Sequence, residues 1–299
     1  MKNLLTLTRV RILLTMRNKM FVFFSVIMPF GFFFLYAGIF AKGDPRAVSF
    51  FLGPVIALTV MGSFWGLSAA LVTYRERGIL RRFHVAPVSA ADLLASSIIA
   101  TFILTIPIAF VELLLAHVLF RVDNLGNILS ATLLITLGTI SFGSLGLLVS
   151  SITNTMQETQ VINQILWLPL IFLSGATFPL AFLPNVVQKF SLFLPATYLV
   201  QGLQAAVFRN VEFWNLPVEL GSLAFWAAIT FFLSTQLFRW EAEAKVPRRA
   251  KLMAVATAIP FLLLGVWENQ YGRIPTQAQA AFRSLASPEN SSPPHGPRR

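Results

Sequence analysis

Long stretches of this chain contain no charged residue, and this feature limits its fold more than any other. Each charge-free stretch has 19 or more residues, and a helix needs about 20 apolar residues to cross the hydrocarbon core of a bilayer. The stretches without Asp, Glu, Lys or Arg are 20–41, 47–74, 124–157, 159–188 and 220–238. Another apolar stretch, 93–120, is interrupted only by Glu112. The pattern predicts an integral membrane protein.

Composition supports this prediction. Charged residues make up 12% of the chain, whereas a soluble domain carries roughly 25%. Helices are favoured over barrel strands because the segments lack an alternating pattern of about ten residues. We therefore predict an all-α bundle of six membrane-spanning helices. The expected spans are 20–40, 50–73, 93–119, 128–149, 160–178 and 216–238.

The basic residues predict the orientation of the bundle. With the N-terminus inside, the inner segments hold 14 Lys and Arg residues and the outer segments hold five. Inner loops of membrane proteins carry the excess of basic residues, so we expect an inner N-terminus. The net charge of +11 is then a topology signal at the ends of apolar segments, and no nucleic-acid partner is expected.

Four regions follow from this reading. Residues 1–19 form a basic segment at the inner face, and 20–245 form the six-span domain. Residues 252–267 are marginal as a seventh span, because the run is short and contains Pro260. The Pro-rich tail, 268–299, is expected to be disordered.

The connection between the fifth and sixth spans, 179–215, is too apolar for a free loop. Pro179, Pro184 and Pro195 divide it into short pieces. We expect short re-entrant helices at the outer side, since irregular backbone at membrane depth must be covered by protein or line a cavity.

The residues that usually carry chemistry are scarce. There is no cysteine and no P-loop pattern for nucleotide phosphates, and the three histidines are too scattered to form a metal site. Ser144 and His117 are expected at opposite depths, so a serine protease pair is disfavoured. Small residues of the fourth span predict a face for close helix packing. They are Gly138, Ser141, Gly143, Ser144 and Gly146.

Glu112 is the one carboxylate inside a predicted span. Acidic residues within a membrane are costly and are often functional. Two readings remain open: Glu112 is a polar wall or relay of a transport path, or it is paired near the outer interface, for example with His117.

The first inner loop, 74–89, carries more than a topology anchor needs. Arginines, an acid and an aromatic residue together are typical of a protein-docking surface. The candidate docking residues are Arg75, Glu76, Arg77, Gly78, Arg81, Arg82 and Phe83. Ser89 followed by Asp92 predicts the N-cap of the next span.

Three segments resemble one known family. They are Arg75 to Gly78 together with Ala86 to Ser89, Leu173 to Leu180, and Leu194 to Tyr198. With the order of the six spans, they make residues 1 to about 245 similar to the permease subunits of type-2 ABC transporters, which export drugs, lipids and polysaccharides.

The resemblance implies a membrane subunit that is not itself an enzyme and holds no cofactor. Two ATPase subunits would bind ATP and Mg and drive a dimer of permeases in a bacterial inner membrane. Arg75 to His84 would form the coupling helix, and Asn154, Gln157 and Glu158 of the second inner loop would make a smaller contact with the ATPase. Spans two and five would line the path, and the candidate path residues are Glu112, Ser174 and Gly175. The apolar spans favour a hydrophobic or amphipathic cargo.

Two other functions stay open. An ion- or proton-coupled carrier would use Glu112 as its ionisable group. A membrane enzyme or structural membrane protein is the third alternative, and Ser144 would be the residue to test for an enzyme.

Overall fold

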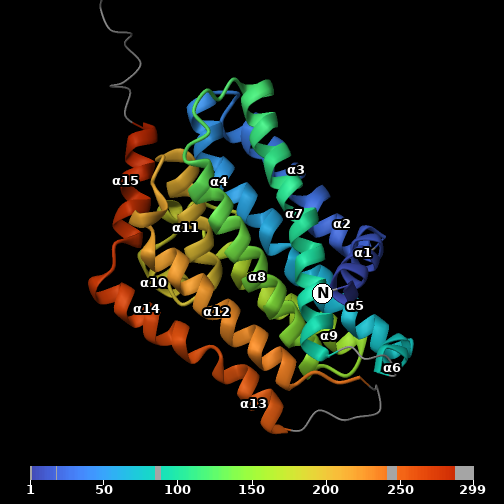
Figure 1. The fold of residues 1–299 in the computed structure, drawn as a ribbon. Helices are drawn as coiled ribbons and strands as arrows, with labels where there is room; N and C mark the ends of the chain where they lie inside the picture. Colours follow the sequence, from blue (N-terminus) through green and yellow to red (C-terminus); the bar gives the residue numbers. More distant parts are fainter. Residues whose placement is uncertain (1, 18, 85–88, 241–247, 287–299) are drawn as a thin grey trace, which may run out of the picture.

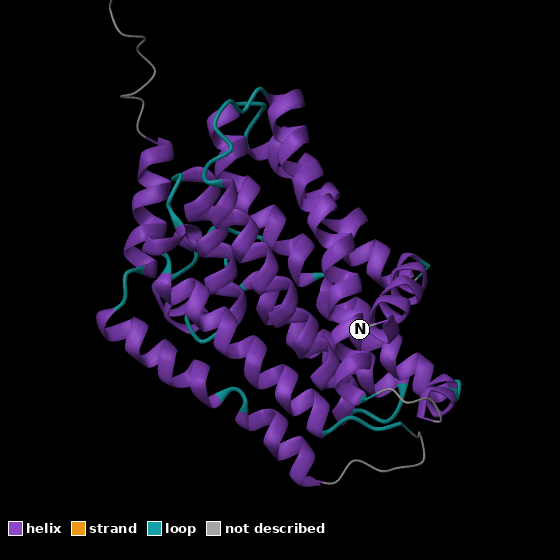
Figure 2. Cartoon of the chain, in the orientation of Figure 1, coloured by secondary structure: helices purple, strands orange, loops and turns teal. Residues whose placement is uncertain are grey.

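The computed structural model describes residues 2–17, 19–84, 89–240 and 248–286, and this part of the chain contains helices but no strand (Figures 1 and 2). Two short π-helices, η1 and η2, lie in the first span, and η3 and η4 are 3-10 helices. In chain order the helices up to the middle of the chain are α1 (Lys2–Met16), α2 (Lys19–Val22), η1 (Phe23–Ile27), α3 (Met28–Leu35), η2 (Tyr36–Phe40), α4 (Pro45–Met61), α5 (Ser63–Glu76), α6 (Ile79–His84), α7 (Ala90–Phe120) and α8 (Ile128–Ile152). They are followed by α9 (Met156–Phe172), η3 (Leu180–Phe182), α10 (Asn185–Ser191), α11 (Pro195–Phe208), η4 (Phe213–Asn215), α12 (Pro217–Gln236), α13 (Arg248–Ala256), α14 (Ile259–Tyr271) and α15 (Ile274–Ala286).

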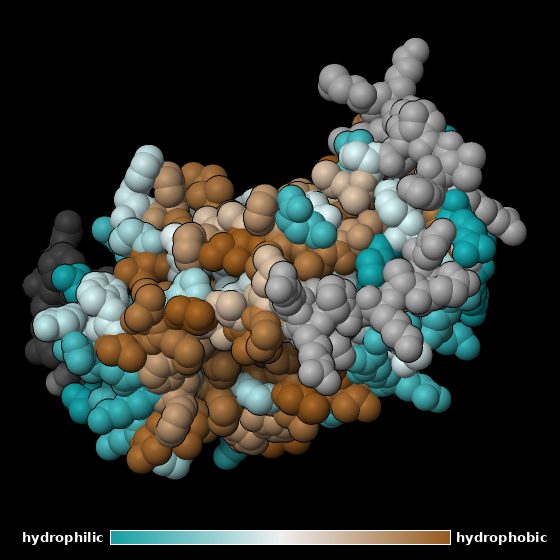
Figure 3. All heavy atoms as spheres, turned by 90° about the horizontal axis from the view of Figure 1, so that it is seen from below, coloured by the Kyte–Doolittle hydropathy of each residue, from teal (hydrophilic) through white to brown (hydrophobic). Residues whose placement is uncertain are grey.

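Six helical segments in the described residues are long and apolar enough to cross a membrane, which confirms the predicted all-α membrane bundle. They are Phe23–Phe40, Pro45–Glu76, Ala90–Phe120, Ile128–Ile152, Pro217–Gln236 and Leu252–Tyr271. Seen from below, apolar side chains cover the middle of the molecule and hydrophilic ones gather at its margins (Figure 3). Such a surface fits a lipid environment.

The predicted fifth span, 160–178, is displaced in the structure. Its helix, α9, begins at Met156 because the hydroxyl oxygen of Thr155 accepts a hydrogen bond from the Glu158 amide and caps the helix. The helix has 17 residues and ends at Phe172. The last residues of the predicted span instead form an irregular turn.

The helices α4 and α5 form the centre of the bundle and are almost wholly buried. They pack against α7, α8 and α11. The small residues of α8 allow this close approach. A Cβ atom at Gly146 would lie 2.4 Å from the carbonyl oxygen of Phe64. The buried small residues thus form the packing face that the sequence predicts.

The helices α10 and α11 are bent by 100° at a short break. Pro195 occupies the first turn of α11, where its missing N–H costs nothing. The break is fixed by side chains: the Tyr198 hydroxyl donates to the Leu192 carbonyl at 2.8 Å, and the Thr197 hydroxyl donates to the Ser191 carbonyl at 2.6 Å. The two expected helices are therefore present, with the geometry of a broken span or a re-entrant loop.

The C-terminal part differs from the expectation of disorder from residue 268 onward, which is wrong for 268–286. Residues 268–271 complete α14, and α15 follows. Ile274, Ala278 and Ala281 are spaced to share one face of α15, and all three are buried in the core. Residues 287–299 lie outside the described residues. The 252–267 segment comprises the end of α13, a turn at 257–258 and most of α14, and these two helices run beside α12 (Figure 1).

The positions of the loops define two ends of the bundle. At one end, which we call the Arg75 end, lie the loops that contain Arg75 and Thr153 and the residues after α12. At the other, which we call the Arg209 end, α15 contacts η3 and α4, and the Phe182 and Phe282 rings meet edge to face at 4.7 Å. The chain after α12 therefore returns from the first end to the second.

The basic N-terminal segment is helical as α1, and it packs on α7. Its Arg11 is buried, and the guanidinium lies 4.9 Å from the centre of the Tyr74 ring. Burial lowers the pKa of Arg11, and Tyr74 acts in the opposite direction. A cation over an aromatic face is attracted by the ring electrons, so this contact attaches α1 to the last turns of α5.

Candidate functional site

At the Arg75 end, three segments distant in sequence meet in one polar cluster. The Arg75 cluster consists of Arg75, Glu76, Thr153, Asn154, Glu158 and Arg239. Arg75 is only 3% exposed. Its guanidinium donates to the carbonyl of Ser150 at 2.8 Å and to that of Thr153 at 2.6 Å. These carbonyls lie at the C-terminus of α8, where the helix leaves acceptors unsatisfied, so Arg75 joins α5 to the end of α8.

The two glutamates of the cluster cap the start of α9. Glu76 accepts a hydrogen bond from the Met156 amide at 2.7 Å. Glu158 accepts from the Asn154 amide at 2.8 Å. Carboxylates at a helix N-terminus satisfy free N–H groups and interact favourably with the helix dipole. The first loop therefore holds the second one in place through both a cation and an anion.

Arg239 adds the segment that follows α12. It donates to the Thr153 carbonyl at 2.7 Å and to the Asn154 side chain at 3.2 Å. Burial lowers the pKa of Arg239, and the carboxylate of Glu158 acts in the opposite direction. From the sequence alone, Arg239 is expected only as a topology signal. The sequence shows a basic residue directly after an apolar span. Its hydrogen-bond partners, Thr153 and Asn154, lie more than 80 residues away, so the sequence does not reveal this contact.

Beyond the Arg75 cluster, the basic residues of the first loop whose side chains the structure describes are exposed. α5 ends where Gly78 adopts a positive φ of 69°, a conformation that favours glycine, and its amide donates to the Arg75 carbonyl at 3.0 Å. The short α6 follows, attached through the fully buried Leu80. Arg77, Gly78 and Arg81 are exposed, so they form the accessible part of the candidate docking surface.

The remaining residues predicted in the two inner loops are partly outside the described residues and partly at the surface. The side chains of Arg82 and Phe83, and all of residues 85–88, lie outside what the structure describes. Gln157 is exposed on the first turn of α9. The predicted cap is confirmed, since the Ser89 hydroxyl oxygen accepts from the Asp92 amide at 3.1 Å and α7 begins at Ala90.

Glu112 is fully buried between α7 and α4. The hydroxyl of Thr59 donates to its Oε1 at 2.5 Å, and its Oε2 has no hydrogen-bond partner among the described residues. The alternative pairing with His117 is not seen, because His117 is exposed and its Nδ1 lies 2.9 Å from the Val122 carbonyl oxygen. Glu112 is thus placed inside a packed helix interface.

The candidate path residues Ser174 and Gly175 form the turn after α9. The Ser174 hydroxyl oxygen accepts from the Ala176 amide at 3.3 Å, and Gly175 has a φ of 94°, which strongly favours glycine. A Cβ there would lie 3.3 Å from the Gln201 side chain. This turn packs on α11, and the structure does not bring it together with Glu112.

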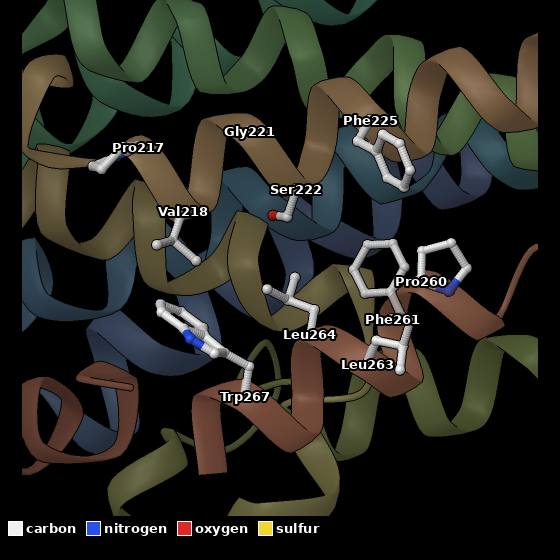
Figure 4. A pocket seen from close by; sticks show the side chains of 10 residues that line it. All are labelled: Pro217, Val218, Gly221, Ser222, Phe225, Pro260, Phe261, Leu263, Leu264 and Trp267. Carbon is white, nitrogen blue, oxygen red and sulfur yellow. The ribbon is translucent and has the colours of Figure 1, made fainter. Parts of the chain in front are cut away.

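Two apolar hollows lie along the C-terminal helices. One, of about 500 Å³, separates α12 from α14 and is lined by Phe225, Phe261 and Trp267 among others (Figure 4). The second, of about 540 Å³, is bordered by α8, α9 and α12 as well as by residues 254–261, and includes Trp226. Hydrocarbon fits such surfaces, because they offer almost no hydrogen-bonding partner. Glu112, Ser174 and Gly175 do not line either hollow.

Comparisons with known proteins agree with this architecture. The family model of the ABC-2 type transporter matches residues 2–208. The linearmycin resistance permease protein LnrN of Bacillus subtilis is 24% identical over 182 residues, which are 61% of this chain and 47% of LnrN. The probable multidrug ABC transporter permease YbhS of Escherichia coli K12 is 28% identical over 181 residues, 59% of this chain and 47% of YbhS.

A third relative matches this chain over a shorter stretch. Nodulation protein J of Rhizobium leguminosarum bv. trifolii is 30% identical over 113 residues, which are 38% of this chain and 43% of that protein. The matched part of the chain thus spans about half the length of these curated relatives. The family match covers more than half of the chain and includes four of the six membrane-length segments found in the described residues. The chain therefore belongs to the ABC-2 type transporter family and is a multi-pass membrane permease of that kind.

Proposed function

We propose that this chain is the membrane-spanning subunit of an ATP-driven exporter, and that a separate ATPase subunit binds ATP and Mg. A second permease copy or a paralogue would complete the pathway. The Arg75 end would face the cytoplasm of a bacterial cell, where the ATPase is located. The relatives named as permeases for linearmycin resistance and probable multidrug transport support an export role.

The observation that carries the proposal is the Arg75 cluster. It joins the first loop, the second loop and the residues after α12 through charge-assisted hydrogen bonds, which are among the stronger ones in proteins. Force applied to the exposed Arg77 and Arg81 would therefore reach α5, α8, α9 and α12 together. ATP binding would shift the permease between two conformations by favouring one of them.

The cargo that we propose is hydrophobic or amphipathic. The hollows beside α12 are apolar, and they lie along helices that are long enough to cross the bilayer. A charged cargo would lose its hydration there without gaining polar partners.

The decisive experiment reverses the exposed charges of the first loop. The chain is reconstituted in proteoliposomes with the ATPase subunit that co-purifies with it, and ATP-driven transport of a candidate drug is measured. The double variant Arg77→Glu/Arg81→Glu should abolish transport while the amount of permease in the membrane stays constant. The matched control, Arg17→Glu/Lys19→Glu, reverses two exposed charges elsewhere and should retain transport.

Two results would contradict the proposal. One is full transport by the Arg77→Glu/Arg81→Glu variant. The other is transport by the purified chain without nucleotide. An ion-coupled carrier would instead lose transport when the proton gradient is collapsed or when Glu112 is replaced by Gln.

A further inference from the structure

Three arginines line one pocket at the Arg209 end of the bundle. Arg46, Arg121 and Arg209 lie at the ends of three different helices, α4, α7 and α11, and the pocket between them has a volume of about 460 Å³. Asp123 is the one carboxylate in its lining. This pocket lies at the opposite end from the Arg75 cluster, so the proposed coupling to an ATPase does not account for it.

The backbone holds these arginines in fixed positions. Arg46 lies in the first turn of α4, which is capped by the side chain of Asp44. Arg121 ends α7 with a left-handed φ of 55°. The loop that follows is attached to α11, because the Asn127 amide donates to the Ala206 carbonyl at 2.8 Å. Arg209 directly follows α11. The site is therefore largely formed before any ligand arrives.

The C-terminal helix α15 forms one wall of the pocket through Ser284. It is attached beside the pocket by Arg209, whose guanidinium donates to the side chain of Gln277 at 3.4 Å. The family match ends at residue 208. This wall is therefore supplied by a part of the chain that lies beyond the matched region.

The charges of the pocket are not balanced. The side chains of Arg46 and Arg121 are exposed, and neither guanidinium forms a hydrogen bond or ion pair with a described residue. The Nε atom of Arg209 is buried and likewise has no hydrogen-bond acceptor in the described part of the chain. Glu219 offsets part of the charge of Arg209. Three cations that converge on one cavity repel each other, and a bound anion would relieve that repulsion.

We propose that this pocket binds the phosphate group of an anionic ligand. The planar guanidinium matches the geometry of phosphate oxygens and can donate two parallel hydrogen bonds to them. Arg46 and Arg121 lie within two residues of the ends of membrane-spanning helices, which is the depth of lipid headgroups. A lipid headgroup and a soluble phosphate compound share this chemistry, and the experiment distinguishes them.

The test compares the full chain with Arg46→Gln/Arg121→Gln, which removes two exposed charges and leaves the contact between Arg209 and Gln277 intact. The control is Lys189→Gln, an exposed cation of α10 that does not line the pocket. Retention of phosphatidylglycerol against phosphatidylcholine is measured by native mass spectrometry in nanodiscs. In a second arm, inorganic phosphate is titrated in detergent while the unfolding temperature is recorded.

The wild-type chain should retain phosphatidylglycerol about tenfold better than the double variant does, since each basic residue near a membrane surface contributes measurably to anionic lipid binding. High salt should reduce that preference. If lipid retention is equal but phosphate raises the unfolding temperature of the wild type and of Lys189→Gln and not that of the double variant, the site takes a soluble phosphate compound. Equal behaviour of all variants in both arms would overturn the proposal. An equal loss in Lys189→Gln would also overturn it, because the effect would then be general surface charge.

Discussion

Arg75 and Arg239 donate to the same carbonyl oxygen, that of Thr153, at 2.6 and 2.7 Å. A carbonyl has two lone pairs, so both bonds can form at once. The two cations lie close together, and the carboxylates of Glu76 and Glu158 offset their repulsion. This small network connects the ends of α5, α8 and α12.

Arg75→Gln should destabilise the protein. The variant loses two charge-assisted hydrogen bonds and leaves the carbonyls of Ser150 and Thr153 without this donor, at a cost of about 3 kcal/mol. Thermal unfolding of the purified protein in detergent would measure the loss. Arg77→Gln is the matched control, because an exposed substitution changes stability by about 0.5 kcal/mol or less. Equal unfolding temperatures for the two variants would show that the buried guanidinium carries no structural role.

The effects of Arg75→Gln and Arg239→Gln should not add. Residues that share one partner show coupling energies of about 0.5–3 kcal/mol. After the first arginine is lost, the second binds the Thr153 carbonyl without repulsion from its neighbour, so relief of repulsion offsets part of each single loss. The double variant should therefore lose more stability than the two single losses combined. A double-mutant cycle by thermal unfolding would measure this. Simple additivity would mean that the two arginines act independently.

Glu112 and Thr59 should respond differently to substitution. Thr59→Val leaves both carboxyl oxygens of Glu112 buried without a partner and should cost about 2 kcal/mol. Glu112→Gln keeps an acceptor for the Thr59 hydroxyl, so stability and ATP-driven transport should both be preserved. Unfolding temperature and transport would be recorded on the same preparations. Loss of transport in a stable Glu112→Gln protein would favour the ion-coupled alternative.

Gly146→Ala should force α8 away from α5. The new methyl group would meet the Phe64 carbonyl oxygen at 2.4 Å, and overpacking of this kind costs about 2 kcal/mol. Gly221→Ala in α12 is the control, because nothing lies within 4 Å of a Cβ there and alanine favours a helix. Comparison of the two unfolding temperatures tests the packing face. A tolerated Gly146→Ala would mean that the two helices can separate freely.

Local features of this fold could be predicted from the sequence, while long-range pairs could not. The charge-free stretches locate most of the spans, and Ser89 with Asp92 identifies the start of α7, because both signals act over a few residues. The contact between Arg75 and Thr153 joins residues 78 positions apart, and no local pattern encodes it. From the sequence alone, Arg75 is therefore expected on a docking surface, whereas in the structure it is buried.

The C-terminal region shows a different kind of error. The prolines and serines of the tail favoured disorder, but Ile274, Ala278 and Ala281 repeat with helical spacing inside the same stretch. Residues with this spacing form a helix despite a composition typical of disorder, because a neighbouring surface buries the apolar face of the helix. The arginine pocket was also missed, because its three members are separated by 75 and 88 residues and converge only through the fold.

The return of the chain from the Arg75 end to the Arg209 end separates the first described helix from the last. Arg11 of α1 meets Tyr74 near the Arg75 end, whereas α15 contacts η3 and α4 at the Arg209 end. A bilayer between the two ends, with the Arg75 end in the cytoplasm as proposed, would put α1 and α15 in different compartments. Alkaline phosphatase fused after residue 286 would then be active in the periplasm. The same enzyme fused after Trp240 would be retained in the cytosol and stay silent.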